Sequence, residues 1–339
     1  MAIFPQESHF RPVNPVFQGL IGAIHQGHSK VIASRLLPGV DTGGNRTGTI
    51  VQLGDTAFGG DLDAKIIRAE GADYFQSPGV QMAAASTFYC QQRGIEARIP
   101  LERLTDADVA VDLYRIQFEA LSMTMLIELE LAVKALIDST TYTTTTLGGA
   151  SVWSDSAADP LNDIENIVEA VSQNGPDANS LVLAYDVGLE FRRHASVADL
   201  MPTTGNRHSL SRPGASALLA DRFGIPEDRI FWADASYNGA DMGQSASIGR
   251  IWSGNVWAGY VDIGAGRAGP NGEGGVMAPI RSSAAARFVM TEEMLDGDGN
   301  LELPYRDYDW VPTDSRVLRV ANAYDLVAPK AALGKRLVA

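Results

Sequence analysis

The glycine-rich stretch Gly264–Gly269 is the first candidate for chemistry, because it matches the GxGxxG pattern of a dinucleotide-binding turn. Such a turn binds a pyrophosphate only where a helix begins in it and its N-terminal N–H groups face the ligand. The following residues, Pro270–Gly275, favour a loop over a helix. We therefore expect no dinucleotide site here.

The acidic run Asp296–Asn300 opens like a calcium-binding loop, in which alternating oxygen ligands surround the ion. An EF-hand loop needs glycine at its sixth position and glutamate at its twelfth, where this chain has Leu301 and Asp307. The tight turn of a β-hairpin explains the run better. We predict no metal site.

Histidine and serine residues form no complete catalytic set. His25 and His28 are spaced almost like two ligands on a helix, but no third ligand stands near them in the sequence. The stretch Gly243–Ser247 lacks the second glycine of a nucleophile elbow, and no helix is predicted after it. His194 and His208 flank polar segments without a base and an orienting group. The sequence thus predicts no catalytic residue and no cofactor.

The composition is that of an acidic protein with a sizeable core: 339 residues, 45% of them hydrophobic, and a net charge of −14. This acidity argues against binding nucleic acid through its phosphates, but it does not argue against enclosing nucleic acid, because the inner wall of a container should repel a packed polyanion. No apolar run is long enough to span a membrane, and the N-terminus has no pattern of a secretion signal. The single cysteine, Cys90, excludes an intrachain disulfide, and a buried side chain is a simpler interpretation than a reactive thiol.

A long helix, predicted over residues 105–138, is the element around which the rest is organised. Its apolar residues recur in steps of three and four, at Val109, Leu113, Ile116, Ala120, Met123, Ile127 and Leu131. The opposite face is expected to carry Asp108, Asp112, Arg115, Glu119 and Ser122. After Met123 the apolar arc widens, which predicts that the second half is covered on more than one side. At roughly 50 Å, such a helix suits a flat, extended subunit.

Residues 1–42 are expected to form an extended arm, because prolines are interspersed with Phe4, Phe10 and Phe17. Apolar side chains on such an arm need a neighbour to pack on, which is either another subunit or the chain's own core.

Residues 43–78 are expected to form a long two-stranded hairpin, in which Thr49–Leu53 runs out and Asp63–Arg68 returns. An isolated hairpin is marginally stable in water, so its outer part needs a partner surface.

The remaining patterns predict helices and strands in alternation. Predicted helices begin at Pro160, Leu189 and Ala215 and end near Asn174, His194 and Phe223. Predicted strands are Ser180–Tyr185, Arg229–Ala233, Ile248–Trp252, Val256–Ile263, Ala286–Met290, Leu301–Tyr305 and Val317–Val320. The turn Ser253–Asn255 is interpreted as joining two of them into a hairpin.

From Thr143 through Trp257 the chain resembles the major capsid proteins of tailed double-stranded DNA phages, which have the Hong Kong 97-type fold. The resemblance is carried by Trp153–Asp155, Asp159–Ile164, Gly175–Leu183, Ala233–Asn238 and Ile251–Trp257. It implies an α+β fold with an N-terminal arm (1–42), an E-loop (43–78), a peripheral domain (79–145) containing the spine helix (105–138), an axial domain (146–261) and a returning peripheral segment (262–339). Because residues 1–42 are not a charged helical segment, it implies the branch without a fused scaffolding prodomain.

The resemblance implies a non-enzymatic protein that forms hexamers and pentamers of an icosahedral head around double-stranded DNA, without reading its sequence. It further implies a separate scaffolding protein, a portal and sometimes a cement protein as partners. The expected location is the virion, with the host cytoplasm during assembly, and no membrane contact is expected. An encapsulin-like compartment with the same fold is the alternative.

The expected contacts between subunits are Phe4, Phe10, Phe17, Phe58, Lys65 and Ile67. Some shells of the resembled family crosslink a lysine to an asparagine, and Lys65 is the only lysine between Lys30 and Lys134. No matching asparagine and glutamate can be identified, so a surface salt-bridge lysine is the alternative role.

Overall fold

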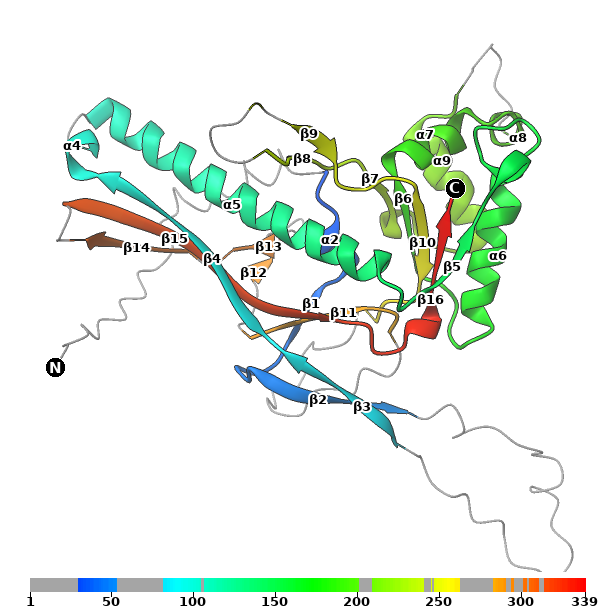
Figure 1. Cartoon of the computed structure of the whole chain (residues 1–339), viewed down its shortest axis with the longest axis horizontal. Coiled ribbons are helices and arrows are strands. Elements are labelled where there is room, and N and C mark those ends of the chain that lie inside the picture. Colours follow the sequence, from blue (N-terminus) through cyan, green and yellow to red (C-terminus); the bar gives the residue numbers. More distant parts are fainter. Residues whose placement is uncertain are drawn as a thin grey trace, which may run out of the picture.

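The structure, a computed structural model, describes residues 30–53, 82–104, 107–200, 209–240, 245, 247–262, 283–290, 294–295, 301–303, 305–310 and 314–339. Figure 1 shows a long helix, α5, lying across one face of a sheet, with a second sheet and several helices at its C-terminal end. We name the sheets after their central strands, the β15 sheet and the β10 sheet. This mixture of helices and sheets confirms the predicted α+β class.

Helix α5 (Ala107–Asp138) confirms the predicted long helix. No glycine or proline interrupts it, and most of its residues are good helix formers. It ends before a run of threonines whose β-branched side chains favour a strand, and β5 (Thr143–Thr146) follows directly.

The buried stripe of α5 differs from the predicted one. The residues that face the core are Phe118, Leu121, Ser122, Met125, Leu126, Leu129, Glu130, Val133 and Ile137. Ile116, predicted inside, is 57% exposed, whereas Ser122, predicted outside, is buried. The prediction was wrong because the helix is apolar around most of its circumference, so spacing alone does not choose a side. The predicted widening after Met123 is confirmed, since Met125, Leu126 and Leu129 are all buried.

The β15 sheet is built on one long strand that has partners on both sides. Strand β15 (Ser315–Val327) pairs with β4 (Gln91–Pro100) along one edge, and with β14 (Tyr305–Trp310) and then β11 (Ala286–Val289) along the other. A short strand, β1 (Gly39–Asp41), adds to β11 in parallel. Helix α5 packs against β15 and β4, and α4 (Leu101–Leu104) links β4 to it.

A two-stranded element projects from this body in Figure 1: β2 (Thr47–Leu53) pairs antiparallel with β3 (Met82–Tyr89). The predicted outgoing strand Thr49–Leu53 lies within β2, and its described partner is Met82–Tyr89. The predicted returning strand, Asp63–Arg68, lies outside the described residues, so its pairing stays a prediction. The base of the pair is held by a small apolar cluster, Val40, Ile50, Phe88, Cys90, Ala286 and Phe288. The Phe88 and Phe288 rings stack there with centroids 4.5 Å apart.

The β10 sheet has the strand order β5-β16-β10-β6-β7. Its further strands are β6 (Ser180–Ala184), β7 (Ile230–Ala233), β10 (Asn255–Gly259) and β16 (Gly334–Val338). Its helices are α6 (Pro160–Ser172), α7 (Tyr185–Arg193), α8 (Ala195–Ala198) and α9 (Arg212–Phe223). The predicted cap of α6 is confirmed, because Asp159 accepts a hydrogen bond from Asn162 N–H and Pro160 opens the helix.

The turn at Ser253–Asn255 does not make the predicted hairpin. Gly254 does adopt the left-handed conformation (φ 68°), but the flanking strands go to different sheets. Strand β9 (Ile248–Arg250) pairs with β8 (Ser236–Asn238), while β10 pairs with β6 and β16. The reason is burial: every residue of β10 is buried, as a central strand requires, whereas every residue of β9 is exposed. In contrast, β12 (Met294–Leu295) and β13 (Leu301–Glu302) do pair, as the predicted hairpin around Asp296–Asn300 requires.

Residues 31–41 lie within the body, so the prediction of an extended arm up to residue 42 was wrong for them. The side chains of Val31, Ile32, Leu36 and Leu37 are buried, and α2 (Ala33–Leu36) packs near α5. For this part of the chain the alternative is confirmed, since the neighbour of the apolar residues is the chain's own core.

At two glycines of the β10 sheet, Gly259 and Gly334, an aromatic ring occupies the space that a side chain would need. A Cβ at Gly259 would lie 2.5 Å from ring carbons of Trp257, which is fully buried. We expect Gly259→Ala to lower the free energy of unfolding by about 1–3 kcal/mol, because the ring has no room to move. The matched control, Gly249→Ala, adds a Cβ that meets nothing within 4 Å. Urea unfolding of both variants measures this, and equal midpoints would contradict the packing argument.

Candidate assembly surfaces and a buried joint

The residues predicted to contact neighbouring subunits, Phe4, Phe10, Phe17, Phe58, Lys65 and Ile67, all lie outside the residues that the structure describes. The same holds for Gly264–Gly269, Asp296–Asn300, His25, His28 and His208. These assignments stay predictions. The candidate contact surfaces described below are formed by other residues.

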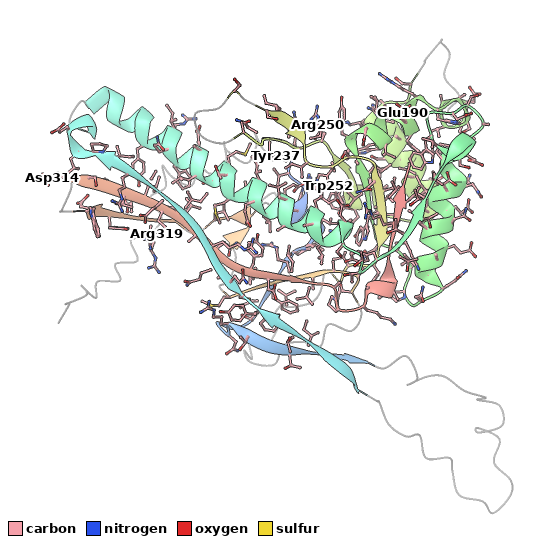
Figure 2. The ribbon with its side chains drawn as sticks, in the orientation of Figure 1. Glu190, Tyr237, Arg250, Trp252, Asp314 and Arg319 are labelled. Atoms are coloured by element: carbon pink, nitrogen blue, oxygen red, sulfur yellow. The ribbon has the colours of Figure 1, made fainter. Side chains whose placement is uncertain are left out.

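The side of the β15 sheet that faces away from α5 carries aromatic and charged side chains. Because side chains alternate along a strand, Tyr305 and Asp307 of β14 point toward α5, where they contact Phe118 and Tyr114. Tyr308 and Trp310 point the other way. We call this side the outer face and define it by Glu96, Arg98, Tyr308, Trp310 and Arg319. Figure 2 shows Arg319 on the side of the strands away from α5.

Arginines hold the two outer-face rings in place. The Arg98 guanidinium lies 5.6 Å from the Trp310 ring centroid, and that of Arg319 lies 5.9 Å from the Tyr308 ring centroid. Glu96 accepts hydrogen bonds from Arg319, at 2.8 Å from Nη2, which keeps this side chain from folding away. The rings remain 36% and 39% exposed for Tyr308 and Trp310. Tryptophan, tyrosine and arginine are the residues that most often dominate protein interfaces, so the outer face has the composition of a docking surface.

The projecting β2–β3 pair is fixed to the body at its base. The backbone N–H of Tyr89 donates to Asp325 Oδ2 at 2.8 Å, which ties β3 to β15. The Tyr89 ring itself is exposed and stacks with the Arg46 guanidinium at 4.8 Å. The pair therefore leaves the body in a defined direction.

A buried carboxylate lies where α5, α2 and the turn before β10 meet. Glu130, in the middle of α5, is fully buried. Its Oε2 accepts the backbone N–H groups of Ile32 and Ala33 at 3.0 and 2.8 Å. Its Oε1 accepts the indole N–H of Trp252 at 2.5 Å. A single side chain thus joins three segments that are far apart in the sequence.

Two buried arginines bind the other end of α2. Arg229 donates from Nη1 to the carbonyl of Arg35 at 2.6 Å and from Nη2 to that of Leu36 at 3.1 Å. Arg287 donates from Nε to the carbonyl of Leu37 at 2.9 Å. The carboxylate lies at the positive end of this short helix and the guanidinium groups at its negative end, which is the favourable arrangement.

Burial raises the pKa of Glu130 from its usual 4.5 to about 7, although its three donors and Arg35 oppose the shift. Between these two pH values the folded chain binds more protons than the unfolded chain, so the free energy of unfolding must fall as the pH rises. We expect the wild type to lose about 3 kcal/mol relative to Glu130→Gln between pH 4.5 and pH 7, with the difference constant above that range. Urea unfolding of dissociated subunits at several pH values measures this. Parallel curves for the two proteins would show that Glu130 does not titrate there.

Sequence reasoning missed Glu130, Trp252, Arg229 and Arg287. For Glu130 a signal existed, because it lies four residues after Leu126 and three before Val133, on the apolar side of a helix. A charged residue in that register predicts a buried partner. The arginines offered no such signal, since each stands in a short strand or turn.

Cys90 and His194, which the sequence analysis considered as possible reactive groups, are both buried and packed within the fold. Cys90 is buried, as expected, and burial raises the pKa of its thiol, with the charge of Asp325 adding to the shift. His194 is buried and hydrogen-bonded to Ser196 Oγ and to the carbonyl of Asp155. Within the described ranges, no group of three His, Cys, Asp or Glu side chains could hold a metal ion. None of the helices described here is both long and apolar enough to cross a membrane.

No model of a known protein family matches the sequence, and no curated protein matches it either. Solved structures do match. A phage-related protein from Bordetella bronchiseptica RB50 is 17% identical, with 96% of each chain covered and a TM-score of 0.64. The virus-like particle from Pyrococcus furiosus is 11% identical, with 94% of this chain and 96% of that chain covered and a TM-score of 0.50. The capsid of Myoviridae phage XM1 is 12% identical, with 91% and 92% covered and a TM-score of 0.50.

These matches run over nearly the whole of each chain, so they concern the complete arrangement of both sheets and α5. The chain has the fold of phage capsid proteins, the Hong Kong 97-type fold, as the resemblance predicted.

Proposed function

We propose that this chain is the shell-forming subunit of a tailed double-stranded DNA phage, its major capsid protein. The observation that carries the proposal is the end-to-end match of the fold to a phage-related protein and to a phage capsid. The acidic composition is consistent with a wall that encloses DNA without gripping it.

In this proposal the regions of the chain correspond to those of a phage capsid subunit. Residues 1–30 are the arm, which joins the body through the largely buried residues 31–41. Residues 43–78 are the E-loop, and residues 146–261 are the axial domain around which hexamers and pentamers form. Residues 79–145 and 262–339 are the peripheral domain, from which β16 returns to the sheet of the axial domain. A separate scaffolding protein, a portal and DNA are the expected partners, with a cement protein in addition where the shell has one.

Assembly in this proposal is the covering of exposed surface by neighbouring copies. The β2–β3 pair projects from the body, and the outer face offers the rings of Tyr308 and Trp310 to a neighbour. Several modest contacts per subunit suit reversible assembly, because each wrong contact can still be broken.

An encapsulin-like compartment is the second candidate, and the match to a virus-like particle from Pyrococcus furiosus supports it. Particles purified from the source organism separate the two candidates. Nuclease-protected genomic DNA with portal and tail proteins, identified by mass spectrometry, is the expected result for a phage head. A packaged enzyme without genomic DNA would overturn the phage proposal and favour the compartment.

A further inference from the structure

The segment of residues 31–37, which we call the root segment, belongs to neither sheet. It contains α2 and precedes β1. Its polar backbone groups are bonded at both ends by the side chains of Glu130, Arg229 and Arg287, which lie about a hundred residues or more further along the chain. The root segment is therefore held by side-chain bonds that can be made and broken together.

These hydrogen bonds set the free-energy difference between a root segment packed in its groove, the docked state, and one that has left it, the released state. Burial of apolar side chains such as Ile32 and Leu36 favours docking, but ordering seven residues opposes it with conformational entropy of similar size. The hydrogen bonds to the three charged groups then decide the outcome. Release requires that water reach these charged groups, because an unpaired charge that stays buried costs more than the bonds that held it.

The chain just after the root segment is suited to bending. Gly43 and Gly44 have positive φ angles of 63° and 81°, and a Cβ at either would meet nothing within 4 Å. The connecting strand β1 has three residues, paired only at one edge of the β15 sheet. The backbone pairs of β15 with β4, β14 and β11 involve neither the root segment nor β1.

We propose that the root segment is a releasable strap, which leaves its groove as a unit while both sheets stay folded and so lengthens the N-terminal arm. Freeing residues 31–42 adds up to about 40 Å of reach. The lengthening of an arm that binds neighbours rests on the proposed function, whereas the release itself does not. Subunits of identical sequence could then contact neighbours at different distances, because each arm could extend to a different length.

Hydrogen exchange of the full chain, kept as dissociated subunits in increasing urea, tests the release. We expect the amides of Ile32 and Ala33 to exchange at least about tenfold faster than those of Leu181 and Val182 in β6, with little dependence on urea, because only a small surface opens. Equal rates and equal urea dependence would show that the root segment opens only with the whole body, and would overturn the proposal.

Variants on α5 show whether the bonds at Glu130 hold the strap. In Glu130→Gln only one acceptor oxygen remains for the N–H groups of Ile32 and Ala33 and for the indole of Trp252. The three donors then compete for it, so exchange of the root segment should rise by about tenfold. The matched control is Glu128→Gln on the same helix, which weakens the bonds from Arg93 of β4 and Tyr324 of β15, contacts that release does not break. Equal acceleration in both variants would contradict a role for Glu130 in the strap. Because no step requires a shell, the result is separate from that of the proposed function.

Discussion

Replacing Glu130 by alanine should be among the most destabilising single substitutions in this chain. Three donors, the N–H groups of Ile32 and Ala33 and the indole of Trp252, would lose their acceptor in a fully buried site. Each unsatisfied buried donor costs about 1–3 kcal/mol, so we expect the free energy of unfolding to fall by roughly 4–6 kcal/mol. Since whole domains are stable by about 5–15 kcal/mol, much of the protein should be unfolded or aggregated on expression.

The matched control is Glu119→Ala, which removes a carboxylate of the same helix from an exposed pair with Arg115. We expect a loss of less than about 0.5 kcal/mol, as for other exposed pairs one helical turn apart. Circular dichroism during urea unfolding of dissociated subunits compares the two variants. Similar midpoints for Glu119→Ala and Glu130→Ala would contradict the joint that we assign to Glu130.

The second large effect is expected on assembly instead of stability. The double variant Tyr308→Ala and Trp310→Ala removes both rings of the outer face, which are 36% and 39% exposed in the single subunit. If a neighbour covers them, as the proposed function requires, each truncation costs about 2 kcal/mol or more of contact energy. Because a shell multiplies this loss over every subunit, we expect the yield of closed particles to fall at least about tenfold.

The control for this variant is Ile116→Ala, which removes an apolar side chain that is 57% exposed on α5, on the other side of the β15 sheet from the outer face. Particle yield is read by sedimentation of lysates, and the unfolding midpoint of each subunit is measured alongside. Full particle yield from the double variant would exclude the outer face as a contact. A large drop in its unfolding midpoint would assign the rings to the core instead.

The elements that the sequence predicted best are those whose ends are set by local chemistry. Helix α6 begins at the Asp159 cap and α9 ends at Gly224 in the left-handed conformation, because each signal acts within a few residues. The resemblance to phage capsid proteins led to the correct fold, since the order of such elements identifies it even where no single motif does.

Strand partners and buried charges were predicted poorly because distant residues decide them. The glycine turn before β10 was predicted to make a hairpin, but β10 pairs instead with β6, from the middle of the chain, and with β16, from its C-terminal end. Likewise the carboxylate of Glu130 has partners about a hundred residues away on either side, which spacing within α5 cannot reveal. The predicted contact residues, including Phe58 and Lys65, lie outside the described ranges and remain open to test.

Sedimentation velocity of the purified full-length protein at high concentration tests the claim that this chain is a shell subunit most directly. We predict a discrete, fast-sedimenting species of megadalton mass, with closed particles of uniform size in electron micrographs of the same fraction. A single species with the mass of one chain, unchanged as the concentration rises, would contradict the account.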